Sequence, residues 1–131
     1  SLENFDFVID AIDTVSAKIA IIETALAVGT PSVSCMGTGN KLDPTAFCVT
    51  DISKTNTCPL ARVMRRELKK RGITHARVIY STEEAITPKE ALEDGSRRSV
   101  PGSLSFVPSV AGLIAASEAV KSILKGEKKN G

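Results

Sequence analysis

The stretch "FDFVIDAIDTVSAKIAIIETALAVGTPSVSCMG", residues 5–37, decides the fold because its hydrophobic period changes twice. The continuous apolar run Phe7–Ile9 is typical of a strand in a parallel sheet that is covered on both faces. From Val15 to Leu26 the apolar residues recur at helical spacing, and Gly29 supplies a C-terminal cap. The sequence therefore predicts an α/β fold built on one right-handed crossover between parallel strands. Its parts are a strand over 6–9, a helix over 15–28 and a strand over 32–35.

The rest of the chain continues the alternation of strands and helices and shows no internal repeat. Pro59 at a first helical position and Gly72 past the last turn mark a second helix. We expect one domain over 1–131, because 131 residues with 42% apolar content can bury one modest core. The further elements predicted are a turn over 37–45, strands over 46–52 and 75–81, helices over 59–71 and 108–125, a mobile loop over 82–105 and a solvated tail over 126–131.

Composition narrows the classes of function. The net charge of +2 is too small to indicate a nucleic-acid or membrane partner by itself, so such an argument needs local clustering. The cysteines Cys35, Cys48 and Cys58 form no CxxC pair, which favours buried free thiols in a reducing compartment. Neither an apolar run of 18 residues nor a signal-peptide pattern is found. We therefore expect a cytoplasmic protein with no membrane segment.

Two aspartates follow the first predicted strand, and they admit two interpretations. Asp13 stands at the strand-to-helix junction, where a carboxylate can cap the helix, a role worth about 1 kcal/mol. Alternatively, Asp13 and Asp10 lie at the carboxyl edge of a parallel sheet, where carboxylates hold Mg²⁺ beside nucleotide phosphates. Lys18, one turn into the helix, is a candidate for a phosphate contact, although an exposed lysine is the commoner outcome.

A second candidate site is the helix predicted over 59–71, which carries six cations against the single acid Glu67. Its residues Arg62, Arg66 and Lys69 share one face at spacings of four and three. Most charged helix faces are only solvated, but this charge excess also fits contacts with RNA phosphates.

Two other features of the sequence do not indicate a functional site. The pair Gly37 and Gly39 completes no phosphate-loop motif, and the single histidine has no serine or cysteine motif nearby.

Three segments resemble a known family. They are "FVIDAIDTVSAKIAII", "DPTAFCVTDISKTNTCPLARVMRRELKKRGI" and "PGSLSFVPSVAGLIAASEAV". Together they are similar to the later half of the tRNA threonylcarbamoyladenosine dehydratases, a branch of the ThiF/HesA/MoeB superfamily of ubiquitin-activating-like adenylating proteins. The similarity runs from Phe5 to about Leu124, and the junction "DAID" is shared more widely by the superfamily. It implies the C-terminal half of a Rossmann-like ThiF/MoeB-type fold, with a mixed sheet flanked by helices.

The resemblance also implies an activity and its site. Family members use ATP to convert the carboxylate of a threonylcarbamoyl group on tRNA into an acyl-adenylate, and ring closure then releases AMP. The second aspartate of the junction is the Mg²⁺–ATP ligand in this pattern, which assigns that role to Asp13; Thr14 follows it where Asn or Ser is usual. The implied cofactors are ATP and Mg²⁺, and the implied partners are tRNA and a second copy of the chain.

One part of the family pattern is absent from this sequence: the glycine-rich GxGGVG loop and the arginine and lysine that grip the triphosphate. We therefore expect a fragment that is inactive by itself. Two alternatives stay open. A sulfur-carrier or ubiquitin-like protein adenylyltransferase would share the junction, but the CxxC…CxxC zinc pair that favours it is missing. A non-catalytic dimerisation or RNA-docking domain would differ from an enzyme in failing to bind nucleotide.

Overall fold

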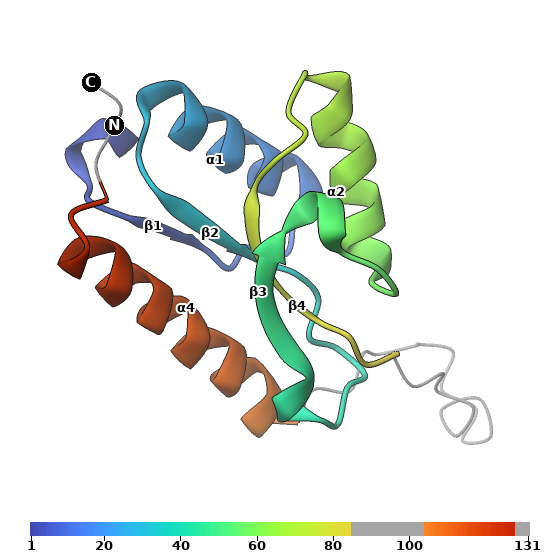
Figure 1. Cartoon of the computed structure of the whole chain (residues 1–131). Helices are drawn as coiled ribbons and strands as arrows, with labels where there is room; N and C mark the ends of the chain where they lie inside the picture. Colours follow the sequence, from blue (N-terminus) through green and yellow to red (C-terminus); the bar gives the residue numbers. More distant parts are fainter. Residues whose placement is uncertain (85–103, 128–131) are drawn as a thin grey trace.

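The computed structural model describes residues 1–84 and 104–127 of the chain (Figure 1). Within these residues, strands and helices alternate along the sequence as expected for an α/β protein. The elements are η1 (Leu2–Asn4), β1 (Val8–Asp10), α1 (Val15–Val28), β2 (Ser32–Cys35), η2 (Pro44–Ala46), β3 (Phe47–Asp51), η3 (Ile52–Lys54), α2 (Pro59–Lys70), β4 (Arg77–Ser81) and α4 (Phe106–Leu124).

The four strands form one mixed sheet in the order β1-β2-β4-β3. β1 and β2 are parallel, with Ile9 opposite Val33, and β2 and β4 are also parallel. β3 joins the edge of the sheet antiparallel to β4, with Val49 opposite Ile79. The predicted mixed sheet is confirmed, as is the parallel pairing of the two strands on either side of the first helix.

The sheet lies between two layers of helix: α1 and α2 cover one face, and α4 covers the other (Figure 1). The alternation of side chains along β4 explains how one strand serves both layers. Val78 and Tyr80 pack with α1 and α2, whereas Ile79 points to the opposite face and packs with Ala111 and Ala115 of α4. The middle of the sheet is therefore buried on both sides, where Val33, Val78 and Ile79 are almost completely buried.

Backbone geometry accounts for where the helices begin and end. Gly29 and Gly72 have φ angles of 72° and 74°, so each adopts the left-handed conformation that glycine tolerates best. Pro59 is the first residue of α2, as predicted. The predicted apolar stripe of α1 was wrong at Leu26, which is 52% exposed. Ala25 takes the inward position instead, because the buried stripe runs through positions 18, 22 and 25 at spacings of four and three.

The small residues of α4 serve packing within the chain. Ala111 and Ala115 are buried against the sheet, while Gly112 and Ala116 remain exposed. By length and composition, α4 is apolar enough to cross a membrane. This is weak evidence for a membrane span, because the core helix of a soluble protein meets the same criteria. One side of α4 is part of the core.

Two predicted segments fall largely outside the described residues: the loop over 82–105, except for its ends, and the tail over 126–131 beyond Glu127. At the near end of the loop, the Glu83 carboxylate accepts hydrogen bonds from the backbone N–H groups of Leu42 and Asp43. In the tail, Glu127 is paired with Arg77 of β4 and is therefore held by the sheet rather than only solvated.

Candidate functional site

A cavity of about 240 Å³ opens where the parallel strands β1 and β2 end. The carboxyl ends of parallel strands are where open α/β sheets bind ligands. Its wall is apolar on the side of α2 and α4, and its polar groups come from the strand ends and α1. The lining residues are Ala11, Ile12, Asp13, Lys18, Cys35, Met36, Gly37, Thr38, Leu60, Pro108, Ala111 and Gly112.

Asp13 brings a carboxylate to the rim of this cavity. Its side chain is exposed, and within the described residues it takes part in no hydrogen bond or ion pair. The predicted capping role for Asp13 was wrong: the N-cap of α1 is Thr14, and it makes no side-chain cap bond. The loop after β1 is one residue too long for Asp13 to reach the cap position. The carboxylate is therefore available to a ligand.

Asp10 and Lys18, by contrast, are bonded to each other below the cavity. Lys18 Nζ donates to Asp10 Oδ2 at 3.1 Å, and the two side chains are 1% and 0% exposed. The other oxygen, Asp10 Oδ1, accepts the backbone N–H of Ile12 at 2.9 Å. Lys18 is therefore not the exposed lysine that is the commoner case. A direct role for either side chain in binding cofactor stays a prediction.

Cys35, at the end of β2, also lines the cavity, and it lies close enough to Lys18 and Asp10 for their charges to act on its thiol. Burial raises the pKa of its thiol, with Lys18 acting in the opposite direction and Asp10 adding to the rise. A neutral thiol is thus favoured, and Cys35 behaves as a lining group rather than a thiolate nucleophile. All three cysteines are free; Cys58 is buried as predicted, whereas Cys35 and Cys48 are half-buried.

The site offers few protein ligands to a Mg²⁺ ion. The described residues contain no group of three or more His, Cys, Asp or Glu side chains able to hold a metal ion, so no dedicated protein cage exists there. Mg²⁺ is usually bound through one or two carboxylates, with water and substrate phosphate completing its shell. The unpaired Asp13 fits the role of one such ligand. Asp10 does not, because its oxygens are already taken by Lys18 and Ile12.

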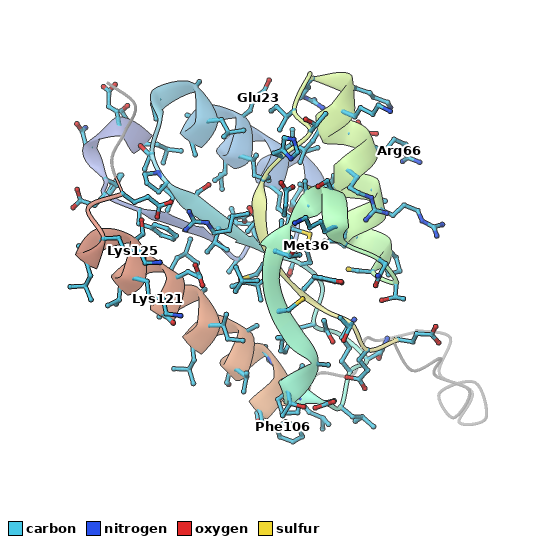
Figure 2. The ribbon with its side chains drawn as sticks, viewed as in Figure 1. Glu23, Met36, Arg66, Phe106, Lys121 and Lys125 are labelled. Carbon is cyan, nitrogen blue, oxygen red and sulfur yellow. The ribbon has the colours of Figure 1, made fainter. Side chains whose placement is uncertain are left out.

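The outer face of α2 is the second candidate site, and its cations differ in the partners that they have in the structure. Glu67 attracts three of them: Lys70 at 3.1 Å, Arg66 at 3.6 Å and Arg71 at 3.9 Å. The pKa of Glu67 is accordingly lowered, above all by its hydrogen bond from Lys70. Arg62 and Lys69 form no ion pair with any described residue. Figure 2 shows Arg66 on the side of α2 that faces away from the sheet.

Near the start of α2 the surface is hollowed. A cavity of about 510 Å³ there is lined by residues that include Arg62 and Arg65. Arg65 is held in place, because its guanidinium donates to the backbone oxygen of Thr55 at 2.9 Å and also contacts the Thr55 hydroxyl. Of the predicted face, Arg62 therefore lines a concave surface together with Arg65, whereas Arg66 and Lys69 do not line it.

Sequence reasoning missed two pairs. His75, exposed and set aside as non-catalytic, lies with Nδ1 2.7 Å from Oδ2 of Asp51. The Asp10–Lys18 pair was also missed, although both residues were candidates. A usable signal exists for the second pair: a helical side chain leans toward the helix N-terminus, so a lysine in the first turns points back at the preceding strand end.

The fold and the cavity define a class: an α/β domain whose parallel strands end at a pocket with one unpaired carboxylate. The chain belongs to the ThiF family, whose family model matches residues 1–130. It is 43% identical over 130 residues to the tRNA threonylcarbamoyladenosine dehydratase of Bacillus subtilis (strain 168), covering 92% of this chain and 51% of that protein. With the dehydratase of Escherichia coli (strain K12) the identity is 31% over 147 residues, covering 97% of this chain and 55% of that protein.

Solved structures agree with this assignment. The E. coli tRNA N6-threonylcarbamoyladenosine dehydratase, TcdA, in complex with ATP matches with a TM-score of 0.78 at 30% identity, over 97% of this chain and 51% of that chain. A structure named TcdA (CsdL) matches with a TM-score of 0.79 at 32% identity, over 93% of this chain and 49% of that chain. The predicted family and fold are thus confirmed. The chain spans about half the length of these relatives.

Proposed function

We propose that this chain is part of an enzyme that uses ATP to cyclise threonylcarbamoyladenosine in tRNA. The observation that carries the proposal is the unpaired Asp13 carboxylate at the strand-end cavity, in a chain 43% identical to a dehydratase of that name. A relative with ATP bound has the same fold over the matched half. The absence of a CxxC pair in the sequence disfavours a sulfur-carrier adenylyltransferase.

In the proposed reaction, a carboxylate oxygen of the threonylcarbamoyl group attacks the α-phosphorus of ATP. The bond between the α- and β-phosphates breaks, pyrophosphate leaves, and an acyl-adenylate forms. A nucleophilic atom of the same group then attacks the activated carbonyl carbon, loses its proton and closes the ring as AMP departs. The net change in the nucleoside is the loss of one water, while ATP becomes AMP and pyrophosphate.

The residues of this chain contribute a wall of that site. Asp13 would hold Mg²⁺, which when bound neutralises charge on the reacting phosphates. The apolar side of the cavity, with Leu60 and Pro108, excludes water from an activated acyl group. The sequence contains no glycine-rich phosphate loop. That loop would lie in a preceding half of a longer protein, so the 131 residues alone should show no ATP turnover.

Contact with tRNA is proposed for the outer face of α2. Arg62 and Lys69 carry charges that no described carboxylate neutralises, and they flank Arg66 on one side of the helix. Phosphate contacts of this kind give affinity without sequence specificity. The concave surface beside Arg62 and Arg65 offers room for the nucleic-acid backbone.

We also propose a homodimer, which the family resemblance implies, and a cytoplasmic location, which the cysteine usage favours. An apolar stripe on the outer face of α4 supports an interface: Leu113, Val120 and Leu124 are 70%, 55% and 80% exposed. Large contiguous apolar patches on a protein surface mark protein–protein interaction sites. The small residues Ala111 and Ala115 are not available to that interface, because they are buried against the sheet.

The test compares Asp13→Asn with Asp6→Asn in a protein that includes the preceding half. Both aspartates are exposed, but Asp6 lies before β1, at the opposite end of that strand. We expect Asp13→Asn to lower tRNA-dependent AMP release by about a hundredfold or more, the scale for a key electrostatic group. The melting temperature should stay unchanged, because the side chain has no partner among the described residues. Asp6→Asn should be neutral.

Two results would contradict the proposal. Near-normal activity of Asp13→Asn would remove the assignment of this carboxylate. If the longer wild-type protein bound tRNA but released no AMP from ATP, the non-catalytic RNA-docking alternative would replace the enzyme.

A further inference from the structure

We propose that Asp10 and Lys18 are positioning residues: together they form a buried bracket that fixes the loop Ala11–Asp13 and sets the Asp13 carboxylate at the rim of the cavity. The bracket consists of contacts within this chain. Its consequence for ligand binding rests on the function proposed above.

The bracket joins three parts of the fold through one carboxylate. Asp10 is the last residue of β1, and its Oδ1 accepts the backbone N–H of Ile12, in the loop, at 2.9 Å. Its Oδ2 accepts the ammonium of Lys18, in the first turns of α1, at 3.1 Å. The strand end, the loop and the helix are thus tied at one point. Asp13 lies one residue beyond the tied amide.

Burial makes this arrangement rigid. The side chains of Lys18 and Asp10 are 1% and 0% exposed, so neither can exchange its partner for water without opening the structure. A buried polar network with defined partners holds its members in one geometry. In contrast, the outer carboxylate of Asp13 has no described partner of its own. Its position is therefore set by the backbone that carries it, and that backbone is held at Ile12.

Stability alone does not explain the pair. Replacing a buried ion pair with apolar residues of similar volume is often neutral or stabilising. A fold that needed only a packed interior at this point would do as well with two apolar side chains. Lys18 also lines the cavity. These facts favour a role in arranging the site over a role in holding the fold together.

Two double variants separate the bracket from packing. Asp10→Asn with Lys18→Met removes both buried charges but keeps a side-chain oxygen that can accept the Ile12 N–H. Asp10→Leu with Lys18→Met also removes both charges, with similar volume, but leaves that N–H without an acceptor. Both double variants avoid the uncompensated buried charge that a substitution of Asp10 or Lys18 alone would create.

The first measurement is amide hydrogen exchange of the 131-residue chain, followed residue by residue by NMR. We expect the Ile12 amide to exchange about tenfold faster or more in the Leu–Met variant than in the Asn–Met variant, because the hydrogen bond that protects this amide is removed. Equal exchange in the two variants would overturn the bracket. If neither variant folds, exchange is measured in the wild-type chain. The proposal then requires the Ile12 amide to exchange more slowly than the Asp13 amide, and equal exchange rates would refute it.

The second measurement is activity in the longer protein. The Leu–Met variant should lose kcat about tenfold or more relative to the Asn–Met variant, with the KM for tRNA unchanged, as expected for a misplaced group near the reacting atoms. Equal kcat values would show that the bracket does not position Asp13. If the wild-type protein itself has no ATP-dependent activity, the proposed function fails, while the exchange measurement still decides whether the bracket exists.

Discussion

The imidazole of His75 lies 2.7 Å from the carboxylate of Asp51, Nδ1 to Oδ2, and this contact joins the segment after α2 to the end of β3. Asp51 also accepts the backbone N–H of Ser53 at 3.0 Å. Burial acts to raise the pKa of Asp51, but these hydrogen bonds outweigh it, and the pKa is lowered below its ordinary value of 3.8. The pair is a stabilising contact at the edge of the sheet.

We predict that His75→Ala raises the pKa of Asp51 toward its ordinary value, because the carboxylate then has one donor fewer. A carboxyl group whose pKa is lower in the folded state stabilises the fold at pH values above its unfolded-state pKa. That stabilisation is lost as the pH falls through the folded-state pKa. The stability of the variant should therefore differ least from that of wild type in strong acid. An NMR titration of the Asp51 carboxyl carbon measures the shift. An unchanged midpoint would leave the Ser53 and Ala76 amides as the whole cause.

Replacing Arg62, Arg66 and Lys69 together with alanine should weaken binding of tRNA to the longer protein. For each phosphate that the protein no longer neutralises, the slope of log K against log salt should become shallower by about 0.7–0.9. Binding measured between low and moderate salt gives the slope. Since the three side chains are exposed, folding should be unaffected. An unchanged slope would make the face of α2 a solvated surface only.

Glu67→Gln should have the opposite effect. Its carboxylate attracts Arg66, Lys70 and Arg71, so its removal frees three cations for phosphate. We expect tighter tRNA binding and a steeper salt slope, by about 0.7–0.9 for each additional phosphate that is neutralised. The matched control is Glu23→Gln, because Glu23 lies on α1 (Figure 2) and pairs only with Arg71 among the described residues, at 3.6 Å. Equal effects of the two substitutions would contradict a specific role for α2.

Cys35 should react slowly with iodoacetamide at about pH 8, near the ordinary thiol pKa, and more slowly than the same residue in the urea-unfolded chain. Its raised pKa reduces the thiolate fraction, and half-burial limits access. Peptide mapping by mass spectrometry distinguishes Cys35 from Cys48 and Cys58. Rapid labelling of Cys35 in the folded chain would indicate a thiolate and contradict its assignment as a neutral lining group.

Local pattern was enough to predict most elements of this protein. The apolar run at Phe7–Ile9, the helical spacing that begins at Val15 and the glycine at 29 define a strand, a helix and its end through short-range sterics and hydrogen bonding. The parallel pairing followed from those elements, because a helix long enough to cross the sheet returns the chain in the same direction. The family was also visible in the sequence, and the comparisons confirm it.

What the tertiary structure decided is which side chains meet. The sequence placed Asp10, Asp13 and Lys18 near one junction, but it could not show that two of them neutralise each other in the interior while the third stays unpaired at the cavity. Likewise, it contained six cations over residues 62–71 without showing that three share Glu67. Periodicity specifies one element at a time, whereas burial and pairing depend on how α1 and α2 lie against the sheet and against each other. These interactions are set by the packing of the whole domain, so only the folded chain fixes them.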